Sequence, residues 1–233
     1  MRVLVTRPQP AAAATAARLE ALGHKAILVP LMAAIRDPRA ALDALAQPHT
    51  AIATTSAEAI RALGGNDLTP HVATPLYCVG SATADIARQS GFQSVIAGAG
   101  TGASLAELII RDGTGGAEGG LLYLAGQPRS PHFEAALEQA GIVCRVVEVY
   151  RMQPIEHTPD DIRAQLALRP DAILFYSQET VRHFFRIVTP AMLTDFDIRL
   201  LCMSSQIADA VPDGIGEIAV AAAPSEESLL ALL

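Results

Sequence analysis

Short apolar runs alternate with amphipathic stretches along the whole chain of 233 residues, and this alternation constrains the fold most strongly. The runs are continuously apolar, as parallel strands covered on both faces are. The predicted strands are Val3–Thr6, Ala26–Pro30, Ala51–Thr54, Leu76–Val79, Ser94–Ala97, Leu121–Leu124, Arg145–Tyr150, Ala172–Tyr176, Arg199–Met203 and Glu217–Ala221. The predicted helices are Ala11–Leu22, Ala57–Leu63, Ala82–Gln89, Ser104–Arg111, Pro131–Ala140, Glu179–Val188 and Glu226–Leu232. Strand, helix and strand joined by short loops predict βαβ units and the α/β class.

The second half of the chain repeats the first at a slowly drifting offset. Equivalent segments are Val3–Val5 and Leu121–Tyr123 at an offset of 118, Thr55–Ser56 and Tyr176–Ser177 at 121, and Cys78 and Cys202 at 124. Such drift indicates duplication with small insertions. Each copy then supplies about five strands, which is enough for one doubly wound, flavodoxin-like parallel sheet. We therefore predict two similar α/β domains related by internal duplication.

Two proline-rich, helix-poor segments occupy equivalent places in the repeat, Pro30–Pro38 and Tyr150–Pro159. If both are crossovers, the first domain combines residues 1–34 and 158–233, and the second comprises residues 38–152. The connectors then lie near residues 31–38 and 150–158. A simple division near Gly116, where glycines crowd together, is the alternative. We favour the crossovers, because those glycines can equally form the loop between a helix and the next strand.

Composition and charge exclude several classes of protein. The net charge of −7, without any basic cluster, argues against nucleic-acid binding. The longest apolar run, Ala26–Ile35, is interrupted by proline and is too short to span a bilayer, and no leader precedes the first strand. Three isolated cysteines suit a reducing cytoplasm, and six scattered histidines predict no metal site. By the same reasoning, the acidic total also disfavours an anionic ligand.

Hydroxyl groups, glycines and two arginines follow the predicted strands, at the edge where open parallel sheets bind ligands. Each hydroxyl can be a helix N-cap, but together such turns also bind anions through free backbone amides. The candidate binding residues are Arg7, Thr55, Ser56, Ser81, Gly126, Arg129, Ser177 and Ser204. The two arginines can make bidentate contacts with carboxylates or lie exposed on the surface. Tyr150 ends a strand where a crossover begins, so its phenol either donates a proton to a ligand or packs at a domain boundary.

Two other functions are compatible with this pattern. Gly98–Ala103 follows a strand and resembles a GxGxxA dinucleotide fingerprint, although no acidic residue ends a strand about 20 residues further on. The chain can also be a non-catalytic two-domain protein that binds a small molecule, but such binders are exported and no leader is visible.

Four motifs, in their order and spacing, closely resemble the uroporphyrinogen-III synthase family. They are Val3–Pro8, Thr54–Ala57, Tyr77–Ala84 and Val147–Arg151, and the resemblance extends over essentially the whole chain. It implies two similar α/β domains joined by a two-stranded antiparallel connector, the first domain being built from both chain ends. It also implies a cytoplasmic lyase of heme biosynthesis. A family member that has lost activity remains an alternative.

The resemblance further implies the reaction. Hydroxymethylbilane, a linear tetrapyrrole handed over by the preceding deaminase, is closed to uroporphyrinogen III with inversion of the last ring and loss of water, without a cofactor. Tyr150 matches the tyrosine that assists departure of the hydroxyl, and Thr55, Ser56, Ser81, Ser177 and Ser204 match turns that hold substrate carboxylates. Ala125 stands where many bacterial members have arginine, and Gln206-Ile207 stands where some members have two threonines. We expect a monomer.

Overall fold

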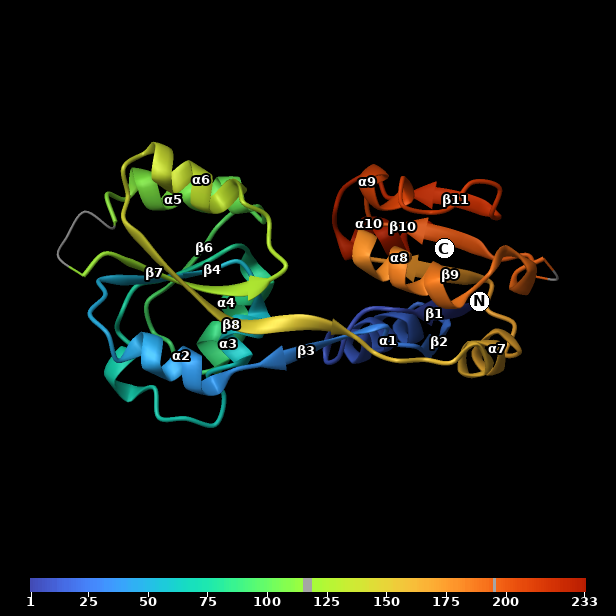
Figure 1. Cartoon of the computed structure of the whole chain (residues 1–233), viewed down its shortest axis with the longest axis horizontal. Helices are drawn as coiled ribbons and strands as arrows, with labels where there is room; N and C mark the ends of the chain where they lie inside the picture. Colours follow the sequence, from blue (N-terminus) through green and yellow to red (C-terminus); the bar gives the residue numbers. More distant parts are fainter. Residues whose placement is uncertain (115–118, 195) are drawn as a thin grey trace. The chain divides into compact units, whose positions relative to one another are not determined.

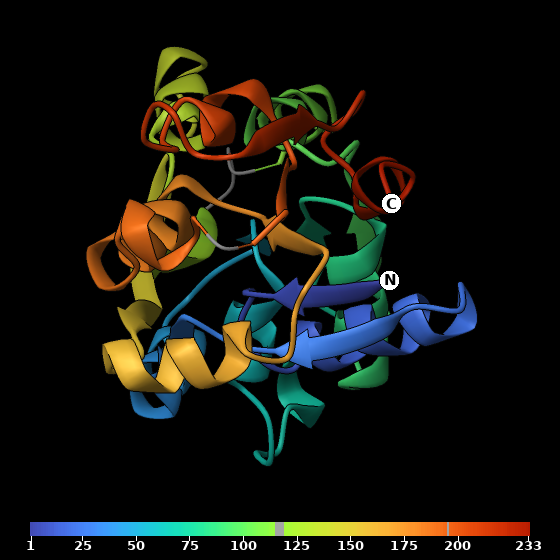
Figure 2. The ribbon, with the colours of Figure 1, turned by 90° about the vertical axis from the view of Figure 1, so that its right-hand side faces the viewer.

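The structure, a computed structural model, describes residues 1–114, 119–194 and 196–233 and divides the chain into two compact units. Unit 1 comprises Met1–Ala33 and Gln153–Leu233, and unit 2 comprises Ala34–Met152. In Figure 1, the blue segment and the orange-to-red segments therefore belong to one unit, and the segments from light blue to yellow belong to the other. Both termini lie in unit 1 (Figure 2). The chain is not divided near Gly116, and Gly116 itself lies outside the described residues.

Unit 1 is a five-stranded parallel sheet in the order β11-β10-β9-β1-β2. Its strands are β1 (Arg2–Val5), β2 (Lys25–Leu28), β9 (Ala172–Phe175), β10 (Arg199–Cys202) and β11 (Glu217–Val220). Its helices are α1 (Ala11–Ala21), α7 (Pro159–Leu166), α8 (Gln178–Ile187), α9 (Ser205–Ala208) and α10 (Glu226–Leu230), with a 3₁₀ turn at Pro190–Met192. Counted within the unit, the strand order is the flavodoxin-like 2-1-3-4-5.

Unit 2 has a six-stranded sheet in the order β3-β8-β7-β4-β5-β6. Its strands are β3 (Met32–Arg36), β4 (Ala51–Thr54), β5 (Leu76–Cys78), β6 (Val95–Ala97), β7 (Leu121–Gln127) and β8 (Cys144–Pro154), of which β3 and β8 run into unit 1. Its helices are α2 (Pro38–Leu45), α3 (Ala57–Arg61), α4 (Ser81–Gln89), α5 (Gly102–Arg111) and α6 (His132–Gln139), with a 3₁₀ turn at Thr69–His71. The predicted α/β class with parallel sheets is confirmed.

The two sheets share one pairing register, which is consistent with the repeat found in the sequence. Val3 of β1 pairs with Ala172 of β9, and the positions related by 118 and 121, Leu121 and Ala51, pair in the same way. The offsets of 121 and 124 likewise relate the pair Ile173–Leu200 to the pair Ile52–Leu76. The two cis peptide bonds, Gln9–Pro10 and Gln127–Pro128, also differ by 118.

Each sheet has apolar clusters on both faces. Successive side chains of a strand point to opposite faces, so Leu4 joins a cluster with α7 and α8, whereas Val3 and Val5 join one with α1 and α10. In unit 2, Leu122 belongs to the cluster of α2, α3 and α4, and Leu121 to that of α5 and α6. Helices on both faces explain why the strands are continuous apolar runs in the sequence.

The chain passes between the units within β3 and β8. The Asp37 amide donates to the Val149 carbonyl (2.8 Å), and the Ile155 amide donates to the Leu31 carbonyl (2.9 Å). Residue numbers rise along one strand as they fall along the other, so β3 and β8 are antiparallel. A connector of two antiparallel strands is what the resemblance implied.

Two helices that the sequence did not predict begin where the connector segments Pro30–Pro38 and Tyr150–Pro159 end. Helix α2 begins at Pro38, and Asp37 caps it by accepting a hydrogen bond from the Ala40 amide (2.9 Å). Helix α7 begins at Pro159 after the Thr158 cap. Proline breaks a helix in its interior but is tolerated in the first turn, where its missing amide would have no intrahelical partner.

We expect Leu4→Ala and its repeat partner Leu122→Ala each to lower the free energy of unfolding by about 2–5 kcal/mol, because both side chains are fully buried. Leu22→Ala is the control, since that side chain is 57% exposed, and it should change stability by less than about 0.5 kcal/mol. Urea unfolding followed by circular dichroism measures all three. Equal effects of Leu4→Ala and Leu22→Ala would contradict the assignment of the core.

Candidate functional site

The turn after β4 holds Thr55 and Ser56 at the carboxyl edge of the unit 2 sheet. The Ser56 hydroxyl caps α3 by accepting a hydrogen bond from the Glu58 amide (3.1 Å). The Thr55 hydroxyl lies 2.7 Å from the hydroxyl of Tyr123, a core residue of β7. Burial is the main cause that raises the pKa of Tyr123. Both predicted residues are therefore half-buried and have intramolecular partners at this edge.

Tyr150 lies on β8 at the same edge and is half-buried against the cluster beneath α2, α3 and α4. The Ser56 side chain and the Glu58 carboxylate both lie near enough to its hydroxyl to shift the pKa of the phenol. Burial raises the pKa of the Tyr150 phenol, the Ser56 side chain lowers it, and the Glu58 charge raises it, with burial the largest cause. This phenol is therefore protonated at neutral pH and can act as a proton donor.

Glu58, whose charge acts on Tyr150, forms ion pairs with two arginines. Its Oε2 accepts from Arg36 Nε (2.9 Å) and Nη2 (2.7 Å), and its Oε1 accepts from Arg61 Nη1 (2.6 Å). The Glu58 side chain is only 14% exposed. The sequence analysis did not single out these three residues, although Glu58 stands in the first turn of a helix that follows a predicted site turn.

Arg129 follows β7 and is held by two carboxylates. Its Nε donates to Glu134 (2.6 Å), and its Nη1 donates to Glu148 (2.6 Å). These hydrogen bonds, the one with Glu134 first, raise the pKa of the guanidinium above its usual value. The side chain is 25% exposed. Arg129 thus lies at the predicted edge, but its charge is already compensated.

Ser81, another predicted binding residue of unit 2, lies after β5. Ser81 is the first residue of α4 and is exposed, and Gly80 precedes it as the cap residue without a side chain. Gly80 also lies close to Gly100, because a Cβ built on Gly80 would stand 3.4 Å from the Gly100 Cα.

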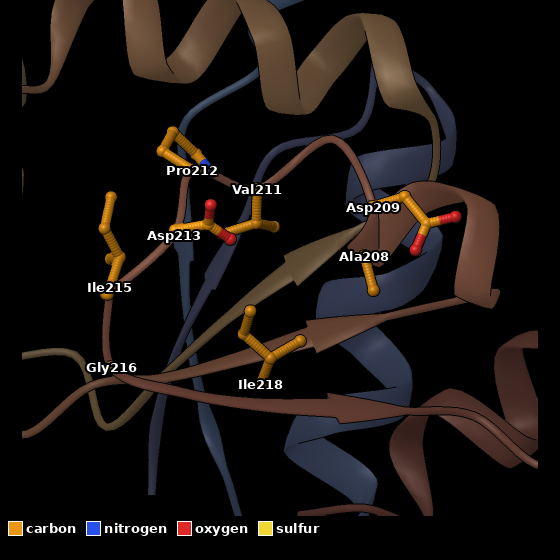
Figure 3. Close-up of a pocket in the computed structure, with 9 residues that line it drawn as sticks. Ala208, Asp209, Val211, Pro212, Asp213, Ile215, Gly216 and Ile218 are labelled. Atoms are coloured by element: carbon orange, nitrogen blue, oxygen red, sulfur yellow. The ribbon is translucent and has the colours of Figure 1, made fainter.

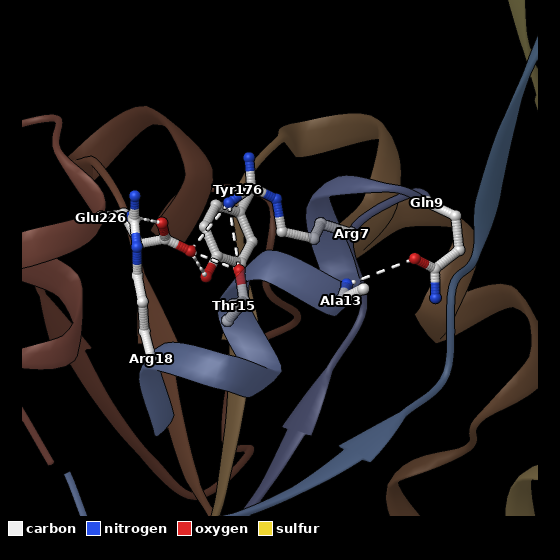
Figure 4. Close-up of polar contacts among 7 residues, drawn as sticks. All are labelled: Arg7, Gln9, Ala13, Thr15, Arg18, Tyr176 and Glu226. Carbon is white, nitrogen blue, oxygen red and sulfur yellow. Dashed lines mark hydrogen bonds and ion pairs between the residues drawn. The ribbon is translucent and has the colours of Figure 1, made fainter. Parts of the chain in front are cut away.

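In unit 1, Arg7 belongs to a cluster centred on the Glu226 carboxylate (Figure 4). Arg7 Nη1 donates to Glu226 Oε1 (2.8 Å), and the Tyr176 hydroxyl donates to the same oxygen (3.2 Å). Thr15 and Arg18 also donate to this carboxylate. The Arg7 guanidinium lies 4.3 Å from the centre of the Tyr176 ring, and burial raises the pKa of Tyr176 to about 12. Arg7 is therefore engaged by the protein itself.

Ser177 and Ser204 cap the helices that follow β9 and β10. The Ser177 hydroxyl accepts from the Thr180 amide (3.2 Å) and lies 2.8 Å from the Thr180 hydroxyl. Ser204 is the cap residue of the four-residue helix α9, without a hydrogen bond from its side chain to that helix. Gln206, where some relatives of the resembled family have threonine, offers its carbonyl to the Gln178 side chain (2.6 Å).

A model of the family described as uroporphyrinogen-III synthase HemD matches residues 13–231. The chain belongs to the uroporphyrinogen-III synthase family. The resemblance inferred from the sequence motifs is thereby confirmed. Members of this family are enzymes of tetrapyrrole biosynthesis in the lyase class, and this chain is such an enzyme.

Solved structures with this fold include two uroporphyrinogen III synthases. The enzyme from Helicobacter pylori 26695 is 19% identical with a TM-score of 0.64, and the alignment covers 100% of this chain and 98% of that one. A mutant enzyme from the extremely thermophilic bacterium Thermus thermophilus is 22% identical with a TM-score of 0.55, and the coverage is 100% and 96%. At such identities, these likenesses show the fold. A search of curated proteins found no match.

The residues that line the hollow drawn in Figure 3 belong to unit 1 and to none of the family motifs. The hollow has a volume of about 490 Å³ and is formed by the end of α9, by β11 and by the loop between them. This is the opposite edge of the unit 1 sheet from Ser177 and Ser204, because a helix that starts at the carboxyl edge ends at the amino edge. Asp209 and Asp213 line it, and their charges disfavour an anionic tetrapyrrole there.

Two of the three glycines of Gly98–Ala103 are explained by packing within unit 2, and the third, Gly100, has a positive φ of 99°, which favours glycine. A Cβ on Gly98 would stand 3.0 Å from the Val79 carbonyl oxygen, and one on Gly102 would stand 3.3 Å from Phe133 Cβ. Thr101 caps α5 in a capping box with Ser104. These contacts account for the motif without a dinucleotide.

Neither a membrane-spanning helix nor a metal cluster is found among the described residues. None of the helices in ranges 1–114, 119–194 and 196–233 is long and apolar enough to cross a membrane. Over the same ranges, no group of three or more histidine, cysteine, aspartate or glutamate side chains has a geometry that could hold a metal ion.

We expect Glu226→Ala to lower the free energy of unfolding by about 1–3 kcal/mol, because Arg7 and Tyr176 would lose a largely buried acceptor. Glu179→Ala is the matched control, since the Glu179–Arg182 pair is about half exposed and should contribute less than about 1 kcal/mol. Urea unfolding at pH 7 measures both. A smaller loss for Glu226→Ala than for Glu179→Ala would contradict the role assigned to this cluster.

Proposed function

We propose that Tyr150 is the acid of the family reaction, in which hydroxymethylbilane is cyclised to uroporphyrinogen III. The phenol donates its proton to the hydroxyl group of the first ring, the carbon–oxygen bond breaks, and water leaves to give a protonated azafulvene and the phenolate. The substituted carbon of the last ring attacks the carbon that carried the hydroxyl group and forms a spiro intermediate. That intermediate fragments and recloses with the last ring inverted. The proton that the last ring loses restores the phenol.

The environment of Tyr150, compared with that of the other tyrosines, carries this proposal. Each of the others forms a hydrogen bond through its hydroxyl, Tyr77 with Thr114, Tyr123 with Thr55 and Tyr176 with Glu226. Tyr77 and Tyr123 are buried, and Tyr176 is covered by the Arg7 guanidinium. Tyr150 combines partial exposure, a serine side chain near its hydroxyl and a raised pKa that keeps its proton in place. These are the properties that general acid catalysis requires.

We further propose that turn amides and hydroxyls at the carboxyl edge of each sheet bind the substrate carboxylates. Thr55, Ser56 and Ser81 serve in unit 2, and Ser177 and Ser204 serve in unit 1. Arg7 and Arg129 are supplementary contacts, because each is already bound to carboxylates of this chain. The proposal includes a cytoplasmic monomer that receives its substrate from the preceding deaminase. Orientation of one strained conformer supplies the rest of the catalysis.

We expect Tyr150→Phe to slow formation of the III isomer by about 100- to 10,000-fold, because general acid assistance is lost. The assay generates hydroxymethylbilane from porphobilinogen with the deaminase, adds this protein, and resolves the product isomers. Tyr77→Phe, which removes a phenol bound to Thr114, is the control and should keep the rate within about threefold. An unchanged rate in Tyr150→Phe would refute the catalytic assignment and leave family membership intact.

The KM for hydroxymethylbilane should depend only modestly on salt, since oriented amides and hydroxyls rather than lysines carry recognition. We expect an increase of less than about tenfold between about 50 and 200 mM NaCl, whereas a polybasic site loses about 10³–10⁵ in affinity. Initial rates in the same coupled assay, with the deaminase in excess, provide the measurement. A steep, polybasic dependence would contradict amide-based recognition.

A further inference from the structure

A bulge in the pairing of β7 with β8 sets where Tyr150 lies. Ala125 pairs with Glu148, but the next residue of β7, Gly126, pairs with Tyr150, so Val149 is an extra residue on β8. Val149 is fully buried, and its carbonyl accepts a hydrogen bond from the amide of Asp37, the residue after β3 (2.8 Å). A bulge of this kind turns the side chains that follow it. Tyr150 is thereby brought opposite Gly126.

The Tyr150 ring occupies the space that any side chain at position 126 would need. A Cβ built on Gly126 would stand 2.0 Å from Tyr150 Cζ, 2.3 Å from its hydroxyl oxygen and 2.4 Å from Cε1. Gly126 is not among the glycines with positive φ, so its backbone conformation is open to other residues. Glycine is therefore required at position 126 because a side chain there would occupy the space of the Tyr150 ring.

The hydroxyl end of the ring lies near the turn after β4. The Ser56 side chain in this turn lowers the pKa of the Tyr150 phenol, and its hydroxyl accepts a hydrogen bond from the Glu58 amide at the start of α3. The ring therefore lies between the β7 backbone at Gly126 and this turn.

We infer that Gly126 is a positioning residue, which holds the Tyr150 phenol in its reactive place by offering no side chain. This inference rests on the proposed function of Tyr150 and replaces substrate binding as the expected role of Gly126. Gly126 affects the reaction only through the position of the Tyr150 ring.

The test is a double-mutant cycle of Gly126→Ala and Tyr150→Ala, with Tyr150→Phe and Gly64→Ala as comparisons. Gly64 is exposed, has no positive φ, and a Cβ there meets only the Arg61 carbonyl oxygen at 3.2 Å. Gly126→Ala should lose about 100-fold or more in the rate of III isomer formation, as Tyr150→Phe does. Gly64→Ala should retain the rate. In the Tyr150→Ala background, Gly126→Ala should change the rate less than about twofold, because no ring is left to displace.

Tyrosine absorbance gives a readout independent of turnover. The chain has four tyrosines and no tryptophan, so alkaline difference spectra report the phenols directly. Burial raises the pKa of Tyr150, and in Gly126→Ala this phenol should titrate closer to about 10, the value of an exposed tyrosine. The melting temperature of Gly126→Ala should fall, and adding Tyr150→Ala should recover much of the loss. This recovery also tests the inference if Gly126→Ala folds poorly.

The outcomes distinguish the proposed acid role of Tyr150 from the inferred positioning role of Gly126. If Tyr150→Phe slows the reaction and Gly126→Ala does not, positioning by Gly126 is refuted while the proposed function stands. If Gly126→Ala slows the Tyr150→Ala variant further by a large factor, Gly126 acts on the substrate directly, and the inference fails. If the double variant is no more stable than Gly126→Ala, the clash with the ring is not the cause. If Tyr150→Phe keeps the full rate, the proposed function itself is wrong.

Discussion

Parallel pairing in one register is the constraint on which the rest of each unit depends. Because neighbouring parallel strands run the same way and end together, every loop that follows one of them emerges at one edge of its sheet. Strand β3, which is antiparallel to β8, is the exception in unit 2. The parallel pairing in this unit brings the turn after β4, the end of β7 and Tyr150 of β8 together, although they are far apart in sequence. The helices that return the chain cover both faces, so the carboxyl edge is where the polar groups of the loops gather.

The arginines at these edges are paired with carboxylates of the protein itself. Each arginine that the sequence placed there is bound by carboxylates of the same unit, Arg7 by Glu226 and Arg129 by Glu134 and Glu148. Partly buried guanidinium groups need such partners, because an unpaired charge is costly outside water. A chain with a net charge of −7 can still bind a polycarboxylate when backbone amides are the main donors. The acidic total therefore does not exclude this class of substrate.

Local sequence signals predicted much of the fold and little of how the site residues are paired. Continuous apolar runs located ten strands that the structure confirms, but they did not mark β3, and only the family resemblance implied a strand in the connector near residues 31–38. The pairing of Arg7 with Glu226 joins residues 219 positions apart, and nothing local marks it. The bulge that places Tyr150 opposite Gly126 likewise depends on how two strands pair. The residue types at the carboxyl edge could be predicted from the sequence, whereas their ion-pair and hydrogen-bond partners depend on how the chain packs.

The repeat also shows how the two edges have come to differ. At an offset of 118, Gly126 corresponds to Pro8 and Tyr150 to Met32, so unit 1 lacks both the open position and the phenol that fills it. At an offset of 121, Tyr176 of unit 1 corresponds to Thr55, and its phenol is committed to Glu226 beneath the Arg7 guanidinium. A phenol that donates to a carboxylate inside its own unit is a fixed structural group. Under the proposed function, Tyr150 of unit 2 is thus the tyrosine suited to acid chemistry. In unit 1, Tyr176 instead links the end of β9 to α10 through Glu226, which also binds Thr15 of α1.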